Sequence, residues 1–352
     1  MNDKSKMEYK QHIKSLDGIR GIAVLLVMLY HFKAPGLSLG FIGVPIFFCL
    51  SGFLITNILL NDRNKPLPEY LKKFFYNRSL RIFPLFYLYL IANYVYILSV
   101  DGSGKGYGWF ILYLQNYYLG AGGSLPGILG HTWSLAIEEQ FYWFWPFILF
   151  FIKDQKLLRI FIPLVFISLI SRYVIFYIIG AKYMINATLL SCADMMVMGA
   201  IFAQLKNHKK STNIAWVVLF IGLIVTLLSV LTMPMSAFWD SRNWASQRWW
   251  LYTALGFLFS SIIFLCYKHE ISGRTNILLK FFKNPFLVYT GKISYGLYMW
   301  HTLCYILLIM FSQKHDILRH NSNLIMPSLI ISYVVATISF YFFELKFLKL
   351  KR

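Results

Sequence analysis

The chain has 352 residues, of which 58% are apolar and only 14% are charged, yet its formal net charge is +20. Soluble domains usually carry roughly 45–50% apolar and about 25% charged residues. This composition excludes disordered and disulfide-rich secreted proteins, and so much apolar surface argues against a soluble nucleic-acid-binding protein. We therefore expect a membrane protein that carries its cations in the loops.

Ten apolar segments are long enough to cross the hydrocarbon core as helices, which takes about 20 residues. In chain order they are 16–33, 39–60, 80–99, 132–152, 157–178, 187–205, 213–231, 249–268, 292–313 and 324–344. The first follows a Lys-rich tail, but no small-residue cleavage site comes after it, so we expect a membrane helix rather than a signal peptide. The sequence predicts an all-α polytopic bundle, with a transmembrane domain at 16–344 between tails at 1–15 and 345–352.

The charges of the loops predict the orientation of this bundle. If both termini are cytoplasmic, the inner segments hold 24 of the 34 lysines and arginines, the outer segments hold 7, and three arginines lie within spans. Enrichment of Lys and Arg on the inner side is the usual signature of membrane topology. We therefore expect both termini to be cytoplasmic.

Two of the outer loops are rich in aromatic residues. The loop 100–131 is also rich in glycine, which indicates a lid or an interfacial segment, and re-entry of 109–119 into the membrane stays open. The loop 232–248 and the start of the next span hold four tryptophans, namely Trp239, Trp244, Trp249 and Trp250. Such rings suit the membrane interface, and stacking on a sugar face is the alternative.

The cysteines give no sign of a metal or redox site. Cys49, Cys192, Cys266 and Cys304 lie in separate apolar segments, and the sequence has no CxxC pair. The histidines do not show HxxxH spacing either. We therefore expect buried thiols and no bound metal.

Ionisable side chains within spans are costly in a bilayer and are therefore candidates for function. They are Asp17, Arg20, His31, Arg81, Glu138, Glu139, Arg172, Asp194 and His301. Arg20 and His31 are 11 residues apart, which places them on one face of the first helix, about 16 Å apart along its axis. Asp17 is close enough to pair with Arg20. A snorkelling arginine and a buried, hydrogen-bonded histidine are the alternative explanation for this helix.

Several of these groups are predicted at similar depth in the bundle. Ser134 and Glu138 are one turn apart in the fourth span, near His31 in depth, and His301 lies in the ninth span. Arg172 and Asp194 also lie in the outer halves of their helices, where they form either a structural ion pair or part of a site. The mixture of histidine, glutamate and an aligned arginine favours a functional cluster.

Five stretches resemble, in order, the motifs of integral-membrane acyltransferase family 3, which includes bacterial O-antigen and exopolysaccharide O-acetylases and nodulation-factor acetylases. They are SLDGIRGIAVLLVMLYH at 15–31 with its Arg-x10-His spacing, GVPIFFCLSGFLIT at 43–56, RSLRIFPLFY at 78–87, HTWSLAIEEQFY at 131–142 and SYGLYMWH at 294–301. The last stretch, and Asp194 with Gly199, are the weaker similarities. Some members carry a fused SGNH hydrolase-like domain after the last span. This chain is similar to the stand-alone form, so we expect no serine-hydrolase relay.

The resemblance implies transfer of an acyl group, most often acetyl, from cytoplasmic acyl-CoA to a glycan hydroxyl. His31 would act as general base, and Glu138 would orient it as a carboxylate does in hydrolase triads. An acyl-histidine intermediate is a variant of this mechanism. Arg20, Arg78 and Arg81 would bind the CoA phosphates, because the planar guanidinium donates two parallel hydrogen bonds.

The other candidates would line or support this site: Asp17, Ser51, His131, Trp133, Ser134, Arg172, Asp194, Ser294, Tyr298 and His301. Arg172 either stabilises the oxyanion or only pairs with Asp194. The implied co-substrate is acyl-CoA, with acetyl-CoA first and succinyl-CoA as an alternative, and no metal is required.

The implied acceptor is a cell-surface or exported glycan such as O-antigen, capsule or exopolysaccharide, free or lipid-linked. The implied location is the bacterial cytoplasmic (inner) membrane, where lipid surrounds the bundle and no nucleic acid takes part. An exporter of a polysaccharide or lipid-linked sugar is the alternative function, since titratable groups at depth also suit proton coupling. A membrane sensor or scaffold is a third possible function, but it would not explain the cluster of ionisable residues.

Overall fold

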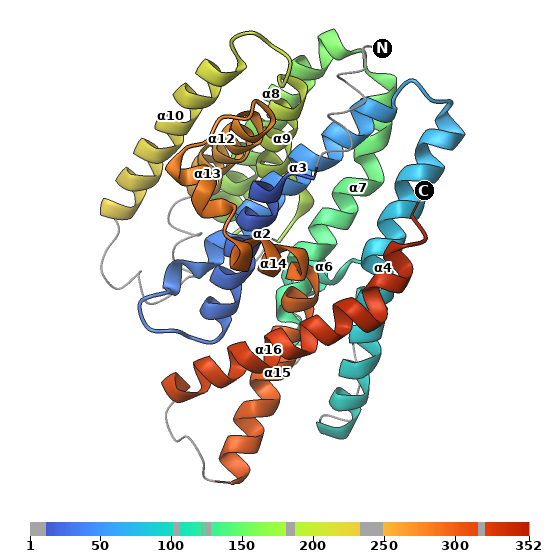
Figure 1. Cartoon of the computed structure of the whole chain (residues 1–352), viewed down its shortest axis with the longest axis vertical. Helices are drawn as coiled ribbons and strands as arrows, with labels where there is room; N and C mark the ends of the chain where they lie inside the picture. The colour runs from blue at the N-terminus through green and yellow to red at the C-terminus, as the bar shows by residue number, and fades with distance from the viewer. Residues whose placement is uncertain are drawn as a thin grey trace.

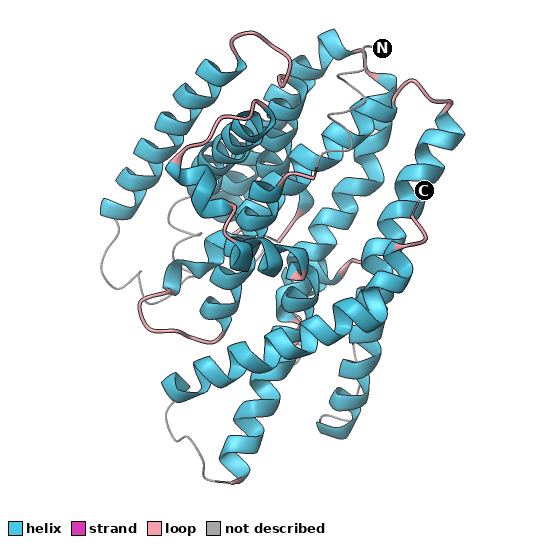
Figure 2. Cartoon of the chain, viewed as in Figure 1, coloured by secondary structure: helices cyan, strands magenta, loops and turns pink. Residues whose placement is uncertain are grey.

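The computed structural model describes residues 12–100, 106–120, 123, 128–180, 187–232, 249–315 and 321–351. Every secondary-structure element in these ranges is a helix (Figure 2), which confirms the predicted all-α class. Most of the predicted N-terminal tail lies outside the described residues, as does the tryptophan-bearing loop from 233 to 248.

The long helices follow the predicted spans. They are α2 (Lys14–His31), α3 (Gly43–Asp62), α4 (Leu67–Val100), α7 (Trp133–Phe151), α8 (Asp154–Tyr173), α9 (Leu189–Gln204), α10 (Ser211–Leu231), α12 (Leu251–Ile271), α15 (Ser294–Lys314) and α16 (Ile325–Ile338). The short α-helices are α5 (Gly108–Ile111), α6 (Gln115–Gly120), α13 (Ile277–Phe282), α14 (Pro285–Lys292) and α17 (Leu345–Leu348). The 3-10 turns are η1 (Ser38–Ile42), η2 (Gly130–Thr132) and η6 (Asn321–Leu324), and the π-helical turns are η3 (Val174–Ile178) and η7 (Ser339–Glu344).

Seven helical stretches in the described part of the chain are long and apolar enough to cross a bilayer, so the protein is a multi-pass membrane protein. They are Ser38–Asp62, Leu67–Leu98, Asp154–Ile178, Ser211–Leu231, Leu251–Ile271, Ser294–Lys314 and Ile325–Leu348. The other three predicted spans form α2, α7 and α9, of which α9 is short. Ionisable residues that mark the candidate site also make α2 and α7 less apolar. The number of ten spans and the orientation of the termini stay predictions.

The predicted spans 39–60 and 80–99 imply a cytoplasmic loop at 61–79, but most of that segment is helical. α4 is one continuous helix of 34 residues that starts at Leu67 and passes through Pro84. At 1.5 Å per residue it measures about 51 Å, longer than the hydrocarbon core of about 30 Å. Charged residues such as Lys72, Lys73 and Arg78 interrupt the apolar pattern in the first turns of α4, so these turns were not predicted. Arg78 and Arg81 therefore project from a rigid helix.

Close backbone contacts hold the centre of the bundle together. A Cβ atom on Gly52 of α3 would lie 1.8 Å from the carbonyl oxygen of Met196 on α9, and one on Gly291 of α14 would lie 1.8 Å from that of Asp17 on α2. Such contacts leave room only for glycine, as in other tightly packed membrane helices. α2 and α3 cross the middle of the view, with α10 at the left edge and α4 at the right (Figure 1).

Candidate active site

Three histidines from distant parts of the chain meet in the bundle, and we call them the histidine cluster: His31 at the end of α2, His131 in η2 and His301 in α15. Nδ1 of His31 lies 2.9 Å from Nε2 of His301, with the ring centroids 5.0 Å apart. The His131 ring stands edge-on, 5.0 Å from His301 and 6.1 Å from His31. His131 and His301 are buried, whereas His31 is partly exposed. Of the three, His31 is therefore the histidine that a substrate can reach.

A network of hydroxyl groups fixes His131 against α15. The Tyr298 hydroxyl donates to the backbone carbonyl of His131 over 2.5 Å and lies 2.6 Å from Oγ of Ser134. Since a phenol has one proton, Ser134 donates to Tyr298 in this arrangement. Oγ1 of Thr302 lies 3.3 Å from Nδ1 of His131 and 3.0 Å from the Tyr89 hydroxyl. The buried hydroxyls thus set the position of η2 beside the other two imidazoles.

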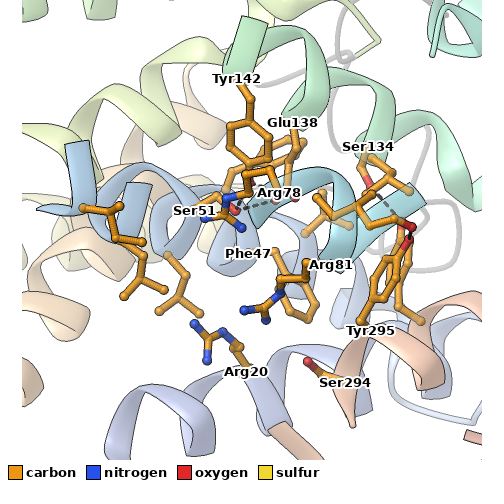
Figure 3. A pocket seen from close by; sticks show the side chains of 18 residues that line it. Arg20, Phe47, Ser51, Arg78, Arg81, Ser134, Glu138, Tyr142, Ser294 and Tyr295 are labelled. Atoms are coloured by element: carbon orange, nitrogen blue, oxygen red, sulfur yellow. Dashed lines mark hydrogen bonds between the residues drawn. The ribbon is translucent and has the colours of Figure 1, made fainter. Parts of the chain in front are cut away.

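A cavity of about 190 Å³ lies among α2, α3, α4, α7 and α15, and we call it the arginine cavity (Figure 3). Its lining includes the predicted site residues Arg20, Ser51, Arg78, Arg81, Ser134, Glu138, Ser294 and Tyr298. Apolar side chains such as Val44, Phe47 and Leu54 form another part of its wall. The three histidines are not among the lining residues, but the lining residue Tyr298 hydrogen-bonds to both His131 and His301. The cavity and the histidine cluster are therefore neighbours that are connected through Tyr298.

Three guanidinium groups point into the cavity, from α2 and α4 (Figure 3). Arg20 hydrogen-bonds to Asp17, as predicted. The Arg78 guanidinium lies over the Tyr142 ring, 5.0 Å from its centroid. Within the described residues, no carboxylate or other acceptor hydrogen-bonds to Arg78 or Arg81. Arg78 is partly exposed and Arg81 is exposed, so both guanidinium groups can donate hydrogen bonds to an anionic ligand.

Glu138 belongs to the arginine cavity and does not contact His31. Its Oε1 accepts a hydrogen bond from Ser51 over 2.9 Å, and the Tyr142 hydroxyl lies 3.0 Å from Oγ of Ser51 and 3.4 Å from Oε2 of Glu138. The expected orienting contact from Glu138 to His31 was therefore wrong, because the ring partner of His31 is His301. Depth along a helix predicts the height of a side chain but not the direction in which it points.

Arg172 and Asp194 form a buried ion pair. Nη1 of Arg172 lies 3.0 Å from Oδ1 of Asp194, and Nη2 lies 2.5 Å from Oδ2. The remaining three N–H groups donate to the carbonyl of Trp249, the carbonyl of Ser191 and the hydroxyl of Thr253. All five donors of this guanidinium are therefore used, and both side chains are fully buried. This confirms the ion pair and leaves Arg172 no free donor for an oxyanion.

The comparison with protein families identifies the domain. A family model described as an acyltransferase domain matches residues 13–343. The chain belongs to this acyltransferase family. The resemblance of its motifs is thereby confirmed, and the cavity and the cluster lie within the matched range.

Curated relatives of this family member are O-acetyltransferases by name. The peptidoglycan O-acetyltransferase OatA of Listeria monocytogenes is 30% identical over 95% of this chain and 56% of its own length. A candidate O-acetyltransferase of Staphylococcus aureus is 30% identical over 84% of this chain and 51% of its own length. YrhL of Bacillus subtilis, a candidate peptidoglycan O-acetyltransferase, is 27% identical over 96% of this chain and 55% of its own length. The chain thus spans about half the length of the curated relatives it matches. No solved structure matches it.

Two polar lining residues of this acyltransferase-family site, both tyrosines, were not predicted from the sequence. Tyr142 supports Ser51 and Arg78, and Tyr295 lines the cavity while its hydroxyl donates to the carbonyl of Ile82 over 2.7 Å. Both lie within the motifs that carry the resemblance, and Tyr142 follows Glu138 by four residues, which places it on the same helix face. Among the predicted residues, Trp133 packs edge-on against Phe48 and does not line the cavity.

Proposed function

We propose that this protein transfers an acetyl group from cytoplasmic acetyl-CoA to a hydroxyl of a cell-surface glycan, in the bacterial cytoplasmic membrane. The observation that carries the proposal is the arginine cavity, where Arg78 and Arg81 form no hydrogen bond within the described residues, next to a partly exposed histidine. Peptidoglycan is the first acceptor to test, because two of the relatives carry it in their names. O-antigen, capsule and exopolysaccharide are the other acceptors.

The walls of the arginine cavity support an acyl-CoA donor. CoA carries phosphate groups, which guanidinium forks bind in a bidentate manner, and Arg78 and Arg81 have free donors in the described structure. The pantetheine arm is less polar, and side chains such as Phe47 and Leu54 offer it apolar contacts. Ser134 and Tyr298 line the cavity, and Tyr298 hydrogen-bonds to His131 of the histidine cluster. A donor held in this way directs its thioester toward His31.

The chemistry assigned to His31 is general base catalysis. An alcohol is a poor nucleophile at neutral pH, and removal of its proton by an imidazole gains about 10²- to 10⁴-fold. As the acceptor oxygen attacks the thioester carbonyl, His31 takes the hydroxyl proton and a C–O bond forms. The C–S bond then breaks, and the CoA thiolate leaves and takes up the proton. In the variant with a covalent intermediate, His31 attacks the thioester first.

The test uses the full chain in lipid nanodiscs with acetyl-CoA and peptidoglycan fragments, and mass spectrometry of the product. We expect the glycan to gain one acetyl group. His31→Ala should lower kcat by about 10²- to 10⁴-fold, whereas Arg81→Ala should raise KM for acetyl-CoA about 10- to 100-fold, through lost charge-assisted hydrogen bonds. His208→Asn, at an exposed loop position, is the control.

Three results would contradict the proposal. The first is a His31→Ala protein that acetylates at the wild-type rate. The second is a wild-type protein in proteoliposomes that moves glycan across the membrane without changing its mass, which would establish the exporter. The third is absence of transfer to every one of the four acceptor glycans.

A further inference from the structure

The surroundings of His301 determine which of its nitrogens carries a proton. Nδ1 of His301 lies 3.0 Å from the carbonyl oxygen of Leu297 and 2.8 Å from that of Tyr298. A carbonyl oxygen only accepts hydrogen bonds, so Nδ1 must be the donor. A neutral imidazole has one N–H group, and Nε2 of His301 therefore presents a lone pair to Nδ1 of His31, 2.9 Å away.

The histidine cluster also favours a neutral His301. The groups around its ring are His31 from α2, His131 from η2 and Tyr298 from α15. Within the described residues, no carboxylate hydrogen-bonds to any of the three imidazoles. A charge on fully buried His301 would therefore lack a counter-ion. It would also oppose the charge that a working His31 must gain, since cations a few ångströms apart repel strongly.

We infer that His301 is a positioning residue that fixes the tautomer of His31, an inference whose catalytic part rests on the proposed function. Neutral His301 accepts at Nε2, so His31 donates from Nδ1, and Nε2 of His31 keeps its lone pair. That atom then takes the proton from the acceptor hydroxyl. An isolated histidine favours the opposite tautomer, with its proton on Nε2, and would present an N–H group instead of a base. His301 thus holds the tautomer of His31 as the carboxylate does in a hydrolase triad, but it supplies no negative charge.

The tautomer is measurable without activity. We would label the histidines of the full chain with ¹⁵N, record spectra in lipid nanodiscs and assign the His31 signals from their loss in His31→Gln. We expect wild-type His31 to carry its proton on Nδ1. In His301→Met, which removes the side-chain acceptor but keeps an apolar side chain of similar volume, the fraction of His31 protonated on Nε2 should rise, with the backbone carbonyl of Val27 left as the remaining acceptor. A wild-type His31 protonated on Nε2 would overturn the inference.

Kinetics separate positioning from a purely structural role. His301→Met should lower kcat by about 10²- to 10⁴-fold with little change in KM for acetyl-CoA, because His301 does not line the arginine cavity. His301→Gln places an amide oxygen near the position of the former Nε2. Its kcat should therefore be about tenfold higher than that of His301→Met. Equal kcat values for the two variants would contradict positioning.

The two proposals fail in different ways. A wild-type protein that transfers no acetyl group would refute the proposed function, while the ¹⁵N spectrum still decides the tautomer. A wild-type protein that is active with His31 protonated on Nε2 would refute only the role of His301.

Discussion

Replacing Asp194 with asparagine should destabilise the bundle far more than it slows the proposed acetyl transfer. The substitution keeps the shape of the side chain but removes its charge, and it leaves the fully buried Arg172 without a counter-ion. Breaking a buried ion pair in this way costs about 3–5 kcal/mol. If only hydrogen bonds were lost, the expected destabilisation would be smaller, since hydrogen bonds between membrane helices contribute about 0.6 kcal/mol on average.

The assay is equilibrium unfolding in mixed micelles, followed by tryptophan fluorescence, with kcat normalised to the folded fraction. A matched control is Glu69→Gln, which breaks the more exposed pair of Lys65 and Glu69, 2.8 Å apart. Pairs of that kind contribute about 0–1 kcal/mol. The double substitution of Arg172→Met with Asp194→Leu should recover most of the lost stability, because it removes both charges.

The opposite pattern would refute this reasoning. If Asp194→Asn unfolds like the wild-type protein but loses kcat, Arg172 acts on the reaction after all. In that case its five hydrogen bonds would have to rearrange when substrate binds, and the oxyanion role would return.

Three further substitutions test the packing and the division of the site. Gly52→Val should reduce the yield of folded, monodisperse protein in size-exclusion chromatography, because the new Cβ would lie 1.8 Å from the carbonyl oxygen of Met196. A wild-type yield would contradict this close contact. Glu270→Ala should lower the free energy of unfolding by about 0.5–2 kcal/mol. The Glu270 carboxylate accepts hydrogen bonds from two backbone N–H groups at the start of α2, at 3.1 and 2.9 Å. An unchanged unfolding curve would contradict this capping role. Arg20→Ala should raise KM for acetyl-CoA with little effect on kcat, which initial rates at varied donor concentration would measure.

The helices were predictable because a membrane-spanning helix requires a long run of apolar residues. About 20 consecutive apolar residues are rare by chance, and each predicted span coincides with a long helix. The first turns of α4 were missed because charged and polar residues interrupt the apolar run at 67–79, and a helix that projects beyond the apolar core needs no continuous apolar run. α13 and α14 were missed for a different reason, since they are shorter than any span and lie within a charged segment.

The members of the site were predictable from residue type and motif, but their pairing was not. Arg20, Arg78 and Arg81 come from two helices and line one cavity, as their shared role implied. His31 and His301 are 270 residues apart in the chain. Their contact depends on how α2 and α15 are rotated about their axes, and spacing within one helix carries no information about that rotation. The contact between Glu138 and His31 was predicted wrongly for the same reason, because the rotation of α7 about its axis could not be inferred from the sequence.

The separation of arginines from histidines suits a site that needs both. A guanidinium beside His31 would oppose the positive charge that a general base gains during the reaction. At an effective dielectric constant of about 20, two unit charges repel by about 4 kcal/mol at 4 Å but only about 1 kcal/mol at 16 Å, the axial distance between Arg20 and His31 on an ideal helix. The neutral hydrogen bond between Ser134 and Tyr298 lies where the two regions meet. A fall in kcat of Arg20→Ala as large as that of His31→Ala would show that this separation does not hold.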